Sequence, residues 1–144
     1  MAIRTSDAEW KGTLKDGEGH MRLGSQAFEG RYSFASRFED GGGTNPEELI
    51  GAAHAGCYSM ALAADLGGAG FSPEYVRTTA KVHLNPRDGG GFEINKIELT
   101  TAAKVPGVEP SKFMEIAEQT KINCPVSYAL RSVPDVTLDA TLET

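Results

Sequence analysis

One long helical segment constrains the fold of this chain more than any other feature of its sequence. The stretch TNPEELIGAAHAGCYSMALA covers residues 44–63, with Asn45 suited to the N-cap and Pro46 to the first helical position. Small and apolar residues then occupy nearly every face of the helix as far as Leu66. A helix with this pattern is buried all round, so we expect it to lie between a sheet and a second layer. A domain of this size has little protein to supply that cover, which predicts a homodimer.

The other segments predict strands that pair antiparallel. Residues 8–23 are typical of a hairpin around the turn KDGEG, and RYSFASRFE at residues 31–39 indicates a further extended piece. Residues 74–105 predict two long strands around a Pro/Gly-rich turn, with a one-residue slip in the second strand. The segment VPDVTLDATLE, residues 133–143, predicts a closing strand.

Two shorter helices complete the expected α+β fold. The first runs from Pro110 to about Ile122, and the second starts at Cys124-Pro125. Strands and helices do not alternate strictly, which favours an antiparallel sheet with a buried central helix over a parallel doubly wound sheet. The length of 144 residues predicts a single domain over residues 1–144.

Composition and charge exclude several classes of partner. The formal net charge is −6 and Lys and Arg are not clustered, which argues against nucleic acid and anionic membranes. No apolar run approaches the roughly 20 residues that span a bilayer, and the N-terminal residues lack the apolar core of a secretory signal. We therefore expect a cytoplasmic protein. In that reducing compartment two cysteines are expected to be reactive, or simply buried, rather than permanently bridged.

The two cysteines, Cys57 and Cys124, are the candidate reactive groups. Cys124 stands before Pro125, a suitable N-cap position, and a helix N-terminus favours a thiolate. Cys57 lies in the middle of the long helix, where apolar surroundings would raise the thiol pKa. From the residues alone, Cys124 is therefore the better nucleophile, and buried filler is an open alternative for both.

Neighbouring polar residues have plainer interpretations. Glu47 and Glu48 complement the positive end of the helix dipole, as first-turn acids commonly do. His54 precedes Cys57 by three residues and could serve as a base, but two ligands do not make a zinc site, and we expect no metal. His20 and His83 lie in expected strands without an evident partner.

The motifs taken together resemble a known family. The segment RFE, followed by GTNPEELIGAAHAGCYSMAL and, far downstream, by NCPVSYAL, is similar to the OsmC/Ohr family, and to its OsmC branch in particular. The resemblance extends over essentially the whole chain. It implies an intertwined homodimer and a thiol-dependent peroxidase that reduces organic hydroperoxides in stress defence.

The resemblance also implies a role for each site residue. Cys57 would be the peroxidatic cysteine and Cys124 the resolving cysteine, which reverses the preference derived from helix capping. Arg37 would stabilise the thiolate and polarise the peroxide, and Glu47 would orient the guanidinium. No bound cofactor is implied. An external dithiol, such as a lipoylated protein, would reduce the disulfide.

Helix geometry adds an argument that does not depend on the family. Glu47 and Cys57 are ten residues apart, which is about 15 Å along a helix axis. If both serve one centre, one of them must come from a partner subunit, most simply across a two-fold axis.

Two other functions are compatible with the residues. One is a non-catalytic, stress-related binding protein whose thiols are filler, and the other is a disulfide exchanger that uses Cys124 as its nucleophile.

Overall fold

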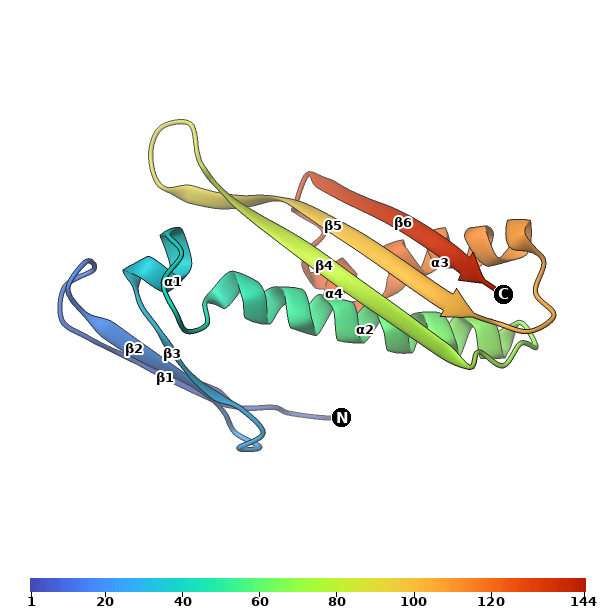
Figure 1. The fold of residues 1–144 in the computed structure, drawn as a ribbon, viewed down its shortest axis with the longest axis horizontal. Coiled ribbons are helices and arrows are strands. Elements are labelled where there is room, and N and C mark those ends of the chain that lie inside the picture. The colour runs from blue at the N-terminus through green and yellow to red at the C-terminus, as the bar shows by residue number, and fades with distance from the viewer. The chain divides into compact units, whose positions relative to one another are not determined.

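The computed structural model describes all residues from Met1 to Thr144. The chain folds into two compact units, Met1–Leu49 and Ile50–Thr144 (Figure 1). None of its helices is both long enough and apolar enough to cross a lipid bilayer. The prediction of a single domain over residues 1–144 remains a prediction.

The first unit is built on a three-stranded antiparallel sheet. Strands β1 (Ser6–Lys11), β2 (Glu18–Leu23) and β3 (Glu29–Tyr32) are ordered β1-β2-β3. The pairing of Ser6 with Leu23 and of Lys11 with Glu18 confirms the predicted hairpin. The connection around KDGEG is short enough for these strands to pair directly, as antiparallel neighbours do.

The prediction of one extended piece over residues 31–39 is wrong in its second half. The strand ends at Tyr32, and helix α1 (Phe34–Phe38) follows. Ser33 caps this helix by accepting from the backbone N–H of Ser36, while the Ser36 hydroxyl accepts from the backbone N–H of Ser33. Such a reciprocal capping box satisfies two backbone donors and starts a helix where alternation alone predicts a strand.

The second unit is built on a three-stranded mixed sheet. Strands β4 (Tyr75–Pro86), β5 (Phe92–Lys104) and β6 (Asp135–Glu143) are ordered β4-β5-β6. The β4–β5 pair is antiparallel and shifts register between His83 and Leu84, which confirms the predicted slip.

The prediction of an antiparallel sheet is wrong for the last strand. Strand β6 runs parallel to β5. Two helices, α3 (Pro110–Asn123) and α4 (Pro125–Ala129), lie between these strands in the sequence and bring the chain back to the start of β5. A crossover of this length allows parallel pairing, which a short turn does not.

The long helix α2 (Pro46–Gly68) is buried along one stripe only. Within the second unit α2 and α3 cover one face of the mixed sheet (Figure 1). The buried stripe of α2 recurs every three or four residues and consists of Gly51, His54, Tyr58, Leu62 and Leu66. The opposite stripe is exposed, and it consists of Ala52, Ala53, Gly56, Met60 and Ala64.

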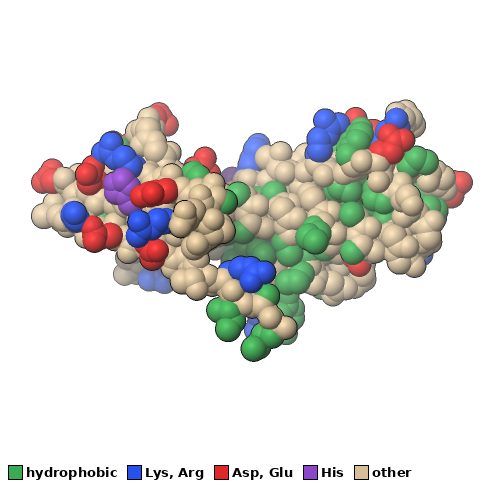
Figure 2. Space-filling model, turned by 90° about the horizontal axis from the view of Figure 1, so that it is seen from below, with side chains coloured by type: hydrophobic (Ala, Val, Ile, Leu, Met, Phe, Trp, Pro, Cys, Tyr) green, Lys and Arg blue, Asp and Glu red, His purple; other side chains and the backbone are tan.

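A single chain therefore leaves one stripe of α2 uncovered, and the predicted cover from a second copy stays a prediction. The exposed stripe carries no charge from Ala52 to Ala64, and Met60 is 79% exposed. In the view of Figure 2 charged side chains gather over β1–β3, whereas uncharged and hydrophobic side chains cover much of the second unit. Contiguous uncharged apolar surface of this kind is typical of an interaction site.

The two strand histidines have partners that the sequence did not indicate. His83 Nε2 lies 2.6 Å from Glu98 Oε2 on the neighbouring strand, and His20 Nδ1 lies 3.7 Å from Glu29 Oε1. The hydrogen bond from His83 lowers the pKa of Glu98. Both contacts depend on strand register, which places residues remote in sequence within reach of each other.

The hydrophobic core of the second unit lies between the sheet and the helices. Its buried members come from α2, β5 and α3 with the loop before it, and include Tyr58, Leu62, Leu66, Ile97, Leu99, Val105, Phe113, Ile116 and Ala117. The Tyr58 hydroxyl donates to the Ala117 carbonyl at 3.0 Å, so the polar end of this buried ring is satisfied.

Adjacent positions on α3 provide a test of this core. Phe113 is fully buried, whereas Met114 is 39% exposed. We expect Phe113→Ala to lower the free energy of unfolding by about 3–5 kcal/mol, because it leaves a cavity. Met114→Ala should change it by about 0.5 kcal/mol or less. Urea unfolding followed by circular dichroism measures both; equal losses would contradict the packing described.

Candidate active site

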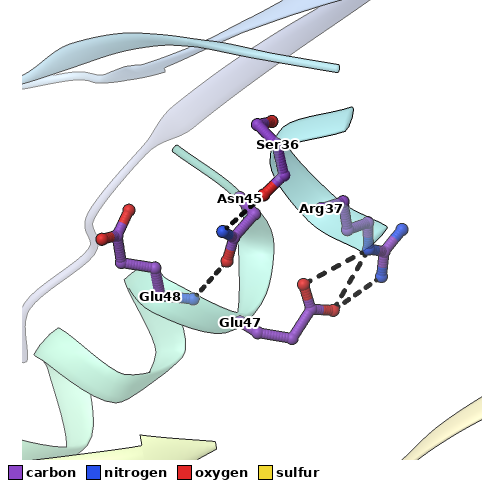
Figure 3. Close-up of polar contacts among 5 residues, drawn as sticks. All are labelled: Ser36, Arg37, Asn45, Glu47 and Glu48. Carbon is purple, nitrogen blue, oxygen red and sulfur yellow. Dashed lines mark hydrogen bonds and ion pairs between the residues drawn. The ribbon is translucent and has the colours of Figure 1, made fainter. Parts of the chain in front are cut away.

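The first part of the site is an ion pair between Arg37 and Glu47. Arg37 Nη2 donates to Glu47 Oε1 at 2.7 Å, and Arg37 Nε lies 3.2 and 3.3 Å from the two carboxylate oxygens (Figure 3). The Glu47 side chain is only 10% exposed, while that of Arg37 is 38% exposed. Such a fork of hydrogen bonds fixes the plane of the guanidinium and leaves part of it open to a ligand.

A set of hydrogen bonds joins α1 to the start of α2 and positions this pair. The Asn45 side chain accepts from the backbone N–H of Glu48 at 2.7 Å, which confirms the predicted N-cap. Its amide nitrogen donates to the Ser36 carbonyl at 3.0 Å, as Figure 3 shows. The Ser36 hydroxyl in turn donates to the Thr44 carbonyl at 2.7 Å. Glu48 accepts from the Thr44 hydroxyl, so its contacts are local to the helix start.

An aromatic cavity lies beside Arg37 in the same unit. Its volume is about 410 Å³, and it is lined by Trp10, Gly12, Leu14, Tyr32, Ser33, Phe34, Arg37 and Phe38. The rings of Trp10 and Tyr32 are 5.3 Å apart, and a Cβ added at Gly19 would lie within 2.8 Å of both. Only glycine therefore allows the two rings to pack over this strand. A mostly apolar cavity with one charged group suits an organic molecule with a polar end.

The second part of the site contains both cysteines. Cys57 lies on α2, and Cys124 is the N-cap of α4, with its sulfur accepting from the backbone N–H of Ser127 at 3.3 Å. The Cys124 side chain is buried, while Cys57 is half-buried, and both are free thiols. This capping confirms the predicted start of α4.

The surroundings of Cys57 raise its pKa. The main cause is burial, which disfavours the charged thiolate. The backbone N–H of Val126 acts in the opposite direction, and the adjacent Cys124 thiol raises the pKa further. The two sulfurs therefore lie within interaction distance, although they are 67 positions apart, and no cation contributes to the shift.

His54 and Ser127 extend this cluster. His54 is fully buried, and its Nε2 lies 2.7 Å from the Ser127 hydroxyl. The same hydroxyl accepts from the Cys124 thiol at 3.2 Å. The sequence indicates His54 as a possible base but gives no role to Ser127. The motif Cys-Pro-x-Ser holds the signal, because it places Ser127 in the first turn of α4, beside the N-cap sulfur.

The structure thus places the predicted site residues in two pairs. Arg37 contacts Glu47 within the first unit, and Cys57 lies beside Cys124 within the second. No group of three or more His, Cys, Asp or Glu side chains is arranged to hold a metal ion.

Comparison with known proteins identifies the family. A family model described as OsmC-like protein matches residues 39–139. Peroxiredoxin OsmC of Escherichia coli (strain K12) is 45% identical over 141 residues, which cover 97% of this chain and 96% of that protein. The chain belongs to the OsmC-like protein family. The predicted resemblance is thereby confirmed.

More distant relatives of this OsmC-like protein agree with that assignment. An organic hydroperoxide resistance protein of Xanthomonas axonopodis pv. citri (strain 306) is 32% identical over 103 residues, covering 68% of this chain and 67% of that one. The crystal structure of an organic hydroperoxide resistance protein OsmC from Legionella pneumophila matches with a TM-score of 0.74 at 25% identity. That match covers 99% of this chain and 100% of the other. The predicted α+β fold is confirmed.

The buried histidine generates a prediction about pH and stability. Burial lowers the pKa of His54 below its ordinary value of about 6.5, so the folded protein holds it neutral where the unfolded chain is protonated. The free energy of unfolding should therefore decline as the pH falls below about 6.5. His54→Gln should lose this part of the decline, and His20→Gln, at an exposed site, should retain it. Urea titrations at a series of pH values measure the difference; superimposable profiles would contradict it.

Proposed function

We propose that this protein is a thiol-dependent peroxidase that reduces organic hydroperoxides to alcohols in defence against oxidative and osmotic stress. Its relatives named peroxiredoxin OsmC and organic hydroperoxide resistance protein support this class of activity. The observation that carries the proposal is the neighbourhood of Cys57 and Cys124, two free thiols at the junction of α2 and α4.

The reaction has two steps in this proposal. The Cys57 thiolate attacks the O–O bond of the peroxide, which releases an alcohol and leaves a sulfenic acid on Cys57. Cys124 then condenses with the sulfenic acid to form a disulfide and water, which protects Cys57 from irreversible oxidation. An external dithiol, such as a lipoylated protein, reduces the disulfide. This reductant is inferred from the family resemblance.

Arg37, held in place by Glu47, supplies the positive charge that would stabilise the Cys57 thiolate. The pKa of Cys57 is raised, and no cation of its own unit contributes to lowering it. The Arg37 guanidinium, fixed by Glu47, would stabilise the thiolate and polarise the peroxide oxygen.

A homodimer is the arrangement that we propose for uniting the two pairs. Glu47 and Cys57 are ten residues apart on α2, about 15 Å along the helix axis. The exposed stripe of small residues on α2 would allow close, antiparallel packing against the same helix of a second copy. Each Cys57 would then meet the Arg37 and Glu47 of the partner, and the two copies together would complete one cytoplasmic, intertwined OsmC-like fold.

The aromatic cavity beside Arg37 provides a place for the organic part of the substrate. Its rings offer apolar contact to an alkyl or aryl group, with the guanidinium at hand for the peroxide oxygens. This arrangement favours bulky organic hydroperoxides over hydrogen peroxide, which has no apolar part to bury.

The proposal predicts a stoichiometric loss of thiols. One equivalent of cumene hydroperoxide should remove both free thiols of each chain and join Cys57 to Cys124 within that chain, as measured by thiol titration and peptide mass spectrometry. Cys57→Ser should leave the protein inert to peroxide. Unchanged thiols would instead favour a binding protein, and disulfide reduction that survives Cys57→Ser would favour an exchanger built on Cys124.

A second prediction concerns the guanidinium. Arg37→Gln should lower kcat/KM for cumene hydroperoxide by about 10²–10³-fold, because a donor to the developing oxyanion and a stabiliser of the thiolate are both lost. The matched control is Arg31→Gln, which removes an exposed ion pair with Glu18 in the same unit. Equal rates for the two variants would contradict the role assigned to Arg37.

A further inference from the structure

Three side chains form a continuous hydrogen-bonded line that ends at the resolving cysteine. The Cys124 thiol donates to the Ser127 hydroxyl at 3.2 Å, and Ser127 Oγ lies 2.7 Å from His54 Nε2. His54 lies on α2, Ser127 lies on α4, and Cys124 is the N-cap of α4. The reaction proposed above uses Cys124 but leaves His54 and Ser127 without a role.

The hydrogen bonds allow proton transfer from sulfur to nitrogen. With Cys124 as a thiol, its proton points to Ser127 Oγ, and the serine hydroxyl can donate to an unprotonated His54 Nε2. After transfer, His54 Nε2 donates to Ser127, and the serine hydroxyl donates to the Cys124 thiolate. The backbone N–H of Ser127, 3.3 Å from the sulfur, also stabilises that thiolate.

The surroundings of His54 keep its ring neutral at rest. The ring is fully buried, its Nδ1 has no hydrogen-bond partner, and burial lowers its pKa. Two cations, Lys121 of α3 and Arg131 after α4, line a cavity of about 270 Å³ together with His54 and Ser127. Burial alone, and neither cation, accounts for the lowered pKa of His54. His54 is therefore available as a base.

We propose that His54, acting through Ser127, removes the proton from Cys124 when Cys124 attacks the sulfenic acid of Cys57. The thiol proton passes to Ser127 Oγ as the serine proton passes to His54 Nε2. The Cys124 sulfur then forms a bond to the Cys57 sulfur, and the S–O bond breaks with its electron pair on oxygen. The departing hydroxide takes the proton from the imidazolium and leaves as water. Cys124 sulfur is oxidised and Cys57 sulfur is reduced by the same amount.

This inference rests on the proposed function, but it concerns the second step alone. His54 acts on the reacting sulfur through another residue, so it is a positioning residue, whereas Ser127 contacts the sulfur directly. The line does not include the sulfur of Cys57. Loss of this hydrogen-bonded line should therefore slow disulfide formation and leave sulfenic acid formation unchanged.

The principal experiment is a single turnover with one equivalent of cumene hydroperoxide. Dimedone adducts and intact mass follow the Cys57 sulfenic acid and the disulfide over time. We expect His54→Gln and Ser127→Ala to form the sulfenic acid at the rate of the unaltered protein and the disulfide about 10- to 100-fold more slowly. Ser127→Thr, which retains a hydroxyl, should restore the rate of disulfide formation.

The pH profile separates a relay from a merely structural role. In the unaltered protein, disulfide formation should be nearly independent of pH above about 6.5, because neutral His54 accepts the proton. In His54→Gln the rate should rise in proportion to hydroxide concentration, because the thiol must lose its proton to solvent. Circular dichroism spectra and thermal midpoints of the variants report whether the fold is retained.

A second arm does not require peroxide. In a Cys57→Ser background, Cys124 is the only thiol, and its alkylation by iodoacetamide is followed by mass spectrometry at pH 7. We expect added His54→Gln or Ser127→Ala to slow alkylation at least fivefold, and added Ser127→Thr to leave it unchanged. If the proteins fail to react with peroxide, the proposed function fails, and this arm still decides the relay. Unchanged alkylation in these variants would overturn the proposed relay. So would a folded His54→Gln protein that forms the disulfide with the rate and pH profile of the unaltered protein.

Discussion

Cys57 is placed where its ionisation is unfavourable. The thiol lies half-buried against the core of the second unit, and that burial raises its pKa, with only the Val126 N–H acting in the other direction. A peroxidatic cysteine has to react as a thiolate. The proposed chemistry would therefore require a cation from outside this cluster, and the fixed guanidinium of Arg37 is the group that the proposed function assigns to it.

The α2 helix carries residues from both parts of the site. Its first turn holds Glu47, its buried stripe holds His54, and its middle holds Cys57. One stripe of α2 consists of alanine, glycine and methionine, carries no charge and is not covered by its own chain. Such a stripe is typical of a surface that another molecule covers. A second copy of α2 on that stripe would cover the apolar surface and, in the same contact, provide the missing cation.

Local signals predicted most of the elements, whereas contacts between distant residues were harder to predict. Capping residues predicted two helix starts, that of α2 at Asn45-Pro46 and that of α4 at Cys124-Pro125. Both starts are confirmed. Helix α1 was missed because its capping box lies within an alternating pattern, and the parallel pairing of β6 depends on a crossover that no local pattern encodes.

The site could be predicted as far as motifs reach. Family resemblance indicated Arg37, Glu47 and the two cysteines, but the hydrogen-bonded line from His54 through Ser127 to Cys124 depends on how α2 and α4 pack.

The central claim, that one active site combines Cys57 of one subunit with Arg37 of the other, is tested by mixing two inactive variants. Arg37→Gln and Cys57→Ser proteins, unfolded together in equal amounts and refolded, should regain about a quarter of the unaltered peroxidase activity, since half of the dimers would contain one intact site. A mixture as inactive as its components would contradict the account.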